Sequence, residues 1–144
     1  MSQVETAVAC FENGFSCSQA VFSTYAKSLG LDGKTALQIA GAFGGGMGHI
    51  GEACGAVTGA FMAIGLKYGK FKPDDDAAKA QTYQLVQEFT RRFKARHGSV
   101  SCKELLKLDL SIPEELKKAQ EEGVFRKLCP GYVQTAAEIL EEIL

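Results

Sequence analysis

Apolar residues recur at helical spacing along almost the whole chain, and strand-like alternation is essentially absent. A first helix is expected over residues 4–11, because its apolar side chains fall at i, i+3, i+4 and i+7 and Gly14 can end it. Further helices are expected over residues 17–29, 35–43, 54–68 and about 76–97. A short helix is expected to begin at residue 102, another to extend from 113 to near 123, and the last to cover 130–144. The pattern predicts an all-α fold, a single compact helical bundle of about six or seven helices in one domain over residues 1–144.

Local sequence signals mark several of the helix starts, among them Asp32, which can cap the helix expected over 35–43. Ser16 with Gln19, and Ser101 with Glu104, have the spacing of a capping box, in which the serine and the third residue after it bond to each other's backbone. Pro130 stands where a proline at the first position of a helix is expected, which predicts that the last helix begins there.

Charge and hydropathy exclude two classes of partner. The formal net charge is −1, and the densest basic run, residues 91–96, has no aromatic platform beside it, so nucleic acid is not expected as a partner. The most apolar window, 39–66, is long enough to span a bilayer, but the glycines of 44–51 would break such a helix at mid-depth. No membrane span is expected. Residues 1–11 lack the basic and apolar blocks of a secretion signal, which predicts a cytoplasmic protein.

Five cysteines are many for a chain of 144 residues outside an oxidising compartment. No C-x-x-C occurs, so any cysteine site must be assembled from distant positions. Four cysteines fall at predicted helix starts, where the helix dipole and free amides lower a thiol pKa: Cys17, Cys54, Cys102 and Cys129. Cys10 lies inside a helix, where a small buried side chain is its expected role. The alternative for all five is simple packing.

A glycine-rich stretch precedes Cys54. Residues 46–51 match G-x-G-x-x-G, but the segment before them is predicted to be helical, so the strand that a dinucleotide site requires is missing. The glycines can instead adopt positive φ and let a second segment approach Cys54. Gly55, Gly59 and Ala63 then repeat on one helix face, which allows close packing against another helix.

These residues carry a resemblance. The segment Cys54-Gly55-Ala56-Val57-Thr58-Gly59, with one cysteine before it and two after it, resembles the C_GCAxxG_C_C family of redox-active proteins. The earlier cysteine corresponds to Cys17 and the later ones to Cys102 and Cys129, whereas Cys10 lies outside the pattern. The resemblance implies redox activity or cofactor binding by these four cysteines, and it does not specify a substrate.

Three functions remain open. In the first, thiol–disulfide exchange without a cofactor, Cys54 attacks an oxidised partner protein or small thiol, and Cys17–Cys54 and Cys102–Cys129 are the preferred pairs. In the second, the four thiolates bind zinc or an iron–sulfur cluster. In the third, the small-residue face forms a homodimer contact. His49, five residues before Cys54, is a candidate to polarise that thiol or act as a ligand; an ordinary loop hydrogen bond is the alternative.

Overall fold

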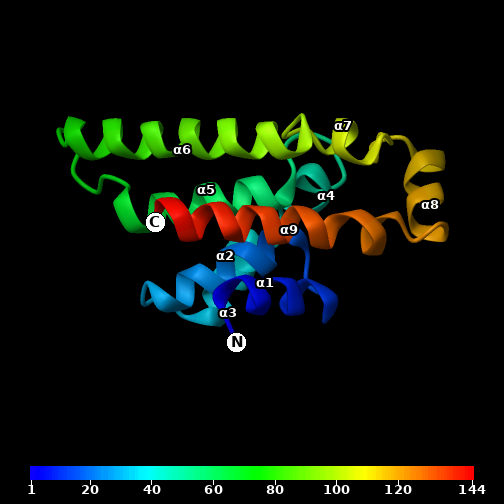
Figure 1. The fold of residues 1–144 in the computed structure, drawn as a ribbon, viewed down its shortest axis with the longest axis horizontal. Coiled ribbons are helices and arrows are strands. Elements are labelled where there is room, and N and C mark those ends of the chain that lie inside the picture. The colour runs from blue at the N-terminus through cyan, green and yellow to red at the C-terminus, as the bar shows by residue number, and fades with distance from the viewer.

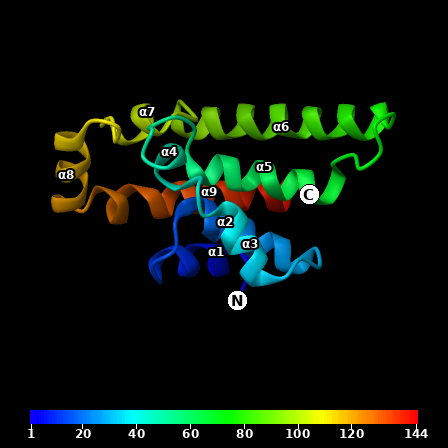
Figure 2. The same cartoon turned by 180° about the vertical axis from the view of Figure 1, so that it is seen from behind.

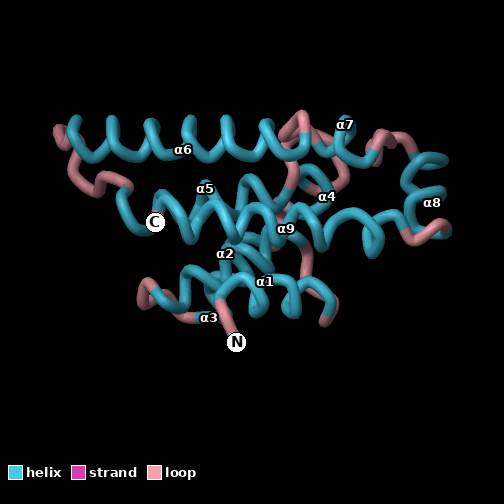
Figure 3. Tube along the Cα trace, viewed as in Figure 1, coloured by secondary structure: helices cyan, strands magenta, loops and turns pink.

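The computed structural model describes all 144 residues and confirms an all-α fold. No strand is present, and the connecting loops are short (Figure 3). The helical segments are α1 (Gln3–Glu12), α2 (Cys17–Ser28), α3 (Gly33–Ala40), α4 (Gly44–Met47), α5 (Gly55–Tyr68), α6 (Asp76–His97), α7 (Cys102–Leu106), α8 (Pro113–Glu121) and α9 (Val124–Ile143). They exceed the expected six or seven, and the element that was not expected is α4, a single short turn within the glycine stretch. No helix is both long and apolar enough to cross a membrane.

Helix α2 lies at the centre of the packing. It contacts α1, α3, α5 and α9, and 28 buried residues form one contiguous hydrophobic cluster around it. The long helices α6 and α9 extend side by side, with α5 packed against both, and α1 to α3 lie on the opposite side of α9 from α6 (Figures 1 and 2). The short helix α8 closes one end of the molecule between α7 and α9.

Most helix starts follow the predicted signals. Ser16 forms the expected capping box with Gln19 at the start of α2, and Asp32 caps α3, which ends at Ala40 rather than at residue 43. The box predicted at Ser101 is wrong, because Ser101 occupies the N-cap of α7 but its side chain makes no capping bond. Its backbone instead pairs with Ala53 in an isolated antiparallel bridge.

The predicted start of the last helix is also wrong. Helix α9 begins at Val124, and Pro130 lies inside it. Proline cannot donate the backbone hydrogen bond that a helix interior requires, at a cost of about 3 kcal/mol or more. The buried face that continues on both sides of Pro130, with Cys129 and Val133 almost fully buried, offsets that cost. Cys129 therefore lies in the middle of a helix and not at its start.

The small-residue face of α5 packs within the chain. A Cβ on Gly59 would lie 2.8 Å from the Ser18 carbonyl oxygen, and one on Gly55 would lie 3.0 Å from the Ser18 nitrogen, so α5 and α2 are in backbone contact. The close helix packing predicted for this face is confirmed, with α2 as the partner. The same face cannot also form the homodimer contact considered above, because it is buried inside the molecule.

The glycine stretch forms a left-handed turn. Residues 45–49 all have φ between 63° and 68°, including Met47 and His49, and the Gly48 amide donates to the Gly44 carbonyl. Each non-glycine residue in this conformation costs about 1–2 kcal/mol. Gly46 lies deepest, since a Cβ there would be 2.7 Å from the Cys102 Cβ and 2.9 Å from the Glu52 nitrogen. The turn thus brings its backbone directly against a cysteine.

Candidate functional site

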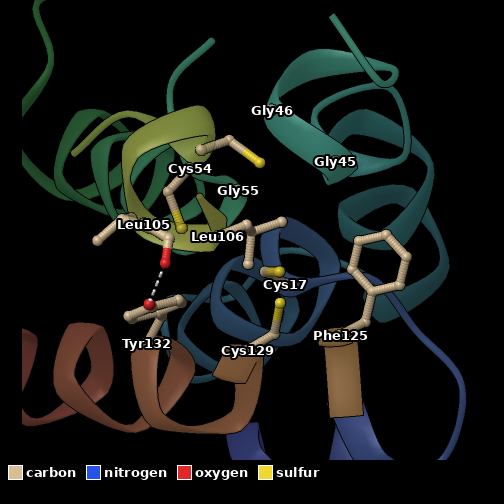
Figure 4. Close-up of a pocket in the computed structure, with 11 residues that line it drawn as sticks. Cys17, Gly45, Gly46, Cys54, Gly55, Leu105, Leu106, Phe125, Cys129 and Tyr132 are labelled. Carbon is tan, nitrogen blue, oxygen red and sulfur yellow. Dashed lines mark hydrogen bonds between the residues drawn. The ribbon is translucent and has the colours of Figure 1, made fainter. Parts of the chain in front are cut away.

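The four cysteines of the sequence pattern line one small cavity. Cys17 begins α2, Cys54 precedes α5, Cys102 begins α7 and Cys129 comes from the middle of α9. The cavity has a volume of about 30 Å³, room for a water molecule or two. Figure 4 shows its wall, which consists of Gly45, Gly46, Gly55, Leu105, Leu106, Phe125 and Tyr132 in addition to the cysteines. Cys10 is not part of this site; its sulfur lies 3.9 Å from the Ser23 hydroxyl.

Cys17 and Cys129 face each other across the cavity. Figure 4 shows their sulfur atoms pointing toward one another from α2 and α9. The neighbouring Cys129 side chain, followed by burial, raises the pKa of Cys17 well above its ordinary value. All five cysteines are free thiols in the structure, so the predicted disulfide pairs stay predictions.

Cys54 and Cys102 are held together by backbone pairing. The Cys54 amide donates to the Val100 carbonyl at 2.8 Å, and the Cys102 amide donates to the Glu52 carbonyl at 2.6 Å, on either side of the Ala53–Ser101 bridge. Side chains alternate between faces along extended chains, so both cysteines project from the face opposite to Ala53 and Ser101. They occupy diagonal positions on it, and both line the same cavity.

The expectation of lowered thiol pKa values is wrong for Cys17, Cys54 and Cys102. Burial raises the pKa of Cys54, and the Cys17 sulfur raises it further, although the amides of Ala56 and Val57 at the start of α5 act in the opposite direction. Burial likewise raises the pKa of Cys102 to about 11, with smaller contributions from Cys17 and from the Asp109 carboxylate. Desolvation of the thiolate therefore outweighs the helix N-terminus.

His49 does not lie beside Cys54. It is exposed, and it lines a surface groove of about 370 Å³ whose wall also includes Cys17 and Cys129 but neither Cys54 nor Cys102. The imidazole lies over Gly45, because a Cβ on that glycine would be 2.4 Å from the imidazole Cδ2 atom. Of the predicted site residues, the structure thus brings the four cysteines to one cavity and His49 to the outer side of its wall.

The sequence did not single out the aromatic part of the site. Tyr132 lines the cavity, donates its hydroxyl hydrogen to the Leu105 carbonyl at 2.8 Å, and contacts the His97 ring edge to face at 4.9 Å. Phe125 and Tyr132 lie four residues before and three residues after Cys129, on the same face of α9. That spacing is the signal that could have identified them, and it was hidden because the helix was expected to begin at Pro130.

The donors do not converge as a metal site requires. Structural zinc and iron–sulfur sites need three or four ligands directed at one ion or cluster. No group of three or more cysteine, histidine, aspartate or glutamate side chains has that arrangement here. The Cys₄ metal hypothesis, with Cys17, Cys54, Cys102 and Cys129 as ligands, is therefore not supported by the geometry of the four thiols.

The fold and the cavity define a class, that of small all-α proteins in which four cysteines from distant segments share one buried site. The chain belongs to the C_GCAxxG_C_C family, because the model of that family, described as "Putative redox-active protein (C_GCAxxG_C_C)", matches residues 15–143. Comparison with curated proteins and with solved structures finds no match. The description of the family names redox activity and specifies neither the reaction nor the partner.

Proposed function

We propose that this protein carries out thiol–disulfide exchange, with Cys17 and Cys129 as the pair that meets the partner. The observation that carries the proposal is that these two thiols face each other at the boundary between the cavity and the groove. Of the four cysteines, they alone line the groove that opens to the surface. This assignment replaces the pairs expected from the sequence, in which Cys17 was joined to Cys54.

Cys129 is the attacking thiol in this proposal. In this proposal the Cys17 S–H, which faces Cys129 (Figure 4), donates to the Cys129 sulfur as that sulfur attacks. Cys17 keeps its proton in that arrangement, which suits it to the second step. The partner is a disulfide small enough to enter the groove, either a low-molecular-weight disulfide or an exposed disulfide of a protein.

The exchange proceeds in two displacements. The Cys129 thiolate attacks one sulfur of the partner disulfide, forms a mixed disulfide and releases the first partner thiolate. Cys17 then loses its proton and attacks the Cys129 sulfur, which releases the second partner thiolate and leaves a Cys17–Cys129 disulfide. The partner gains two electrons and two protons, and the protein loses the same number. His49, on the wall of the groove, is the proposed proton acceptor for Cys17.

The test is to oxidise the reduced protein with one equivalent of hydroxyethyl disulfide and map the bridge by peptide mass spectrometry at early times. We expect Cys17–Cys129 to form first. The Cys10→Ser variant is the matched control, because Cys10 lies outside the site, and it should give the same first bridge. A first bridge between any other cysteines, or no bridge at all, would contradict the proposal.

A second measurement examines the order of attack. Cys17→Ser keeps a hydroxyl that can donate to Cys129, whereas Cys17→Ala removes the donor, and neither can resolve the mixed disulfide. Since a hydrogen bond to a charged group is worth about 1.5–3 kcal/mol, Cys17→Ala should form the Cys129 adduct roughly 10-fold or more slowly than Cys17→Ser. Equal rates would exclude Cys17 as the donor that activates Cys129.

A further inference from the structure

The four thiols fall into two kinds, according to whether they line the surface groove. Cys17 and Cys129 line both the inner cavity and the groove, whereas Cys54 and Cys102 line the inner cavity alone. All four are almost fully buried, with exposed fractions of 9% for Cys17, 5% for Cys54, 6% for Cys102 and 4% for Cys129, so the lining of the groove alone separates the two kinds. A partner that enters the groove therefore meets the first two thiols and not the second two.

Cys54 and Cys102 are nevertheless arranged as a pair. Their backbones are joined by two hydrogen bonds around the Ala53–Ser101 bridge, and both side chains project from the same face into the same cavity. Gly46 leaves space for this arrangement, because any side chain at that position would collide with Cys102. A disulfide between Cys54 and Cys102 would connect two chain segments that backbone hydrogen bonds already hold side by side.

Cys17 links the two pairs. Its Cβ lies 3.3 Å from the position that a Cβ on Gly55 would occupy, so it is next to the start of α5 and to Cys54. It also lines the same cavity as Cys54 and Cys102.

We infer that Cys54 and Cys102 form a second, internal redox pair, which exchanges with the Cys17–Cys129 disulfide through Cys17. The inference rests on the proposed function, since the outer disulfide must first be formed by the partner. The chain would then reduce two partner disulfides and form two disulfides of its own, Cys17–Cys129 at the groove and Cys54–Cys102 inside.

The transfer balances within the chain. Cys54 loses its proton and attacks the Cys17 sulfur of the outer disulfide, which forms a Cys17–Cys54 bond and releases Cys129 as a thiolate. Cys102 then loses its proton and attacks the Cys54 sulfur, which forms the Cys54–Cys102 bond and releases Cys17. The two protons pass to Cys129 and Cys17. No further oxidant is consumed, and the outer pair is reduced again and can react with a second partner disulfide.

The first arm of the experiment counts thiols. The fully reduced, folded protein is titrated with excess hydroxyethyl disulfide, and free thiols and bridges are measured by alkylation and peptide mass spectrometry. Four of the five thiols should be lost in two stages, ending with Cys17–Cys129 and Cys54–Cys102, while Cys10 stays free. Loss of two thiols with a Cys17–Cys129 bridge alone would overturn the internal pair but leave the proposed function intact. No loss at all would contradict the proposed function itself.

The second arm tests the route through Cys17. Cys102→Ser combined with Cys129→Ser leaves Cys17 and Cys54 as the remaining thiols of the cavity, and oxidation should trap a Cys17–Cys54 bridge. In Cys17→Ala, the Cys54–Cys102 bridge should not form within the time that the wild type needs to complete it. Failure to trap the first bridge, or formation of the second at the wild-type rate, would overturn the relay. Circular dichroism verifies that each variant is folded, and Cys10→Ser is the matched control.

Discussion

Gly46 is the position at which a single methyl group should disturb the site most directly. In Gly46→Ala, the new Cβ would meet the Cys102 Cβ at 2.7 Å and two backbone atoms, the Glu52 nitrogen and the Gly51 Cα, at 2.9 Å. Backbone atoms cannot move away by a rotamer change, so the overpacking lowers the unfolding free energy by about 1–3 kcal/mol. The φ of +67° adds about 1–2 kcal/mol for a residue with a Cβ. The expected loss of unfolding free energy is therefore about 2–5 kcal/mol.

Gly48→Ala is the matched control. Gly48 belongs to the same left-handed turn with a φ of +63°, but a Cβ there would meet nothing closer than the Ala42 carbonyl oxygen at 3.8 Å. It should therefore lose only the conformational cost of about 1–2 kcal/mol. Urea unfolding of both variants, followed by far-ultraviolet circular dichroism under reducing conditions, measures the difference. If the two stabilities agree within about 0.5 kcal/mol, the turn is not packed against Cys102 as described.

Three further predictions concern stability and rate. Gly65→Ala, which meets nothing within 4 Å in α5, should stabilise the fold by up to about 1 kcal/mol, whereas Gly59→Ala should destabilise it by about 1–2 kcal/mol, as compared by urea unfolding. The unfolding free energy should fall as the pH rises from about 8.5 toward 11, because the Cys102 thiol loses its proton at a lower pH in the unfolded chain than in the folded one. Over this window the unfolding free energy of wild type should fall by about 2 kcal/mol more than that of Cys102→Ser. Equal decreases in the two proteins would contradict the raised pKa of Cys102. His49→Gln should slow closure of the Cys17–Cys129 bridge without slowing the first adduct, as measured by quenched mass spectrometry, and an unchanged closure rate would remove His49 from the proposed mechanism.

The parts of the fold that depend on neighbouring residues were predictable from the sequence. The cap at Ser16 and the cap at Asp32 each need only a side chain and an amide three residues away, and both are present. The start of α9 was not predictable in this way, because a proline suits the first turn of a helix and is merely tolerated in its interior. The segment 124–129 is helical because it packs against the rest of the molecule, and the local sequence does not predict that packing.

The sequence predicts which cysteines come together in the structure, but it does not predict the pKa values of their thiols. The sequence pattern correctly grouped Cys17, Cys54, Cys102 and Cys129, and the glycines correctly indicated close approach of other segments. The error lay in the thiol pKa values. A helix N-terminus contributes about 0.3–1 kcal/mol, whereas a shift to about 11 at Cys102 corresponds to about 2–3 kcal/mol of desolvation and charge repulsion. Only the tertiary structure gives the burial that decides between these two effects.

High thiol pKa values are compatible with exchange inside the cavity. At pH 7, a thiol with a pKa of about 11 is ionised in about one molecule in 10⁴, so Cys102 is nearly inert toward solutes that also have to reach it. Well-oriented groups in the same molecule, however, react with effective concentrations of about 10⁵–10⁸ M. That factor exceeds the loss of thiolate whenever a neighbouring disulfide lies in line with the attacking sulfur. In the proposed relay, exchange of Cys54 and Cys102 with a disulfide formed between Cys17 and Cys129 would therefore be faster than their reaction with an oxidant in solution, as an internal pair requires.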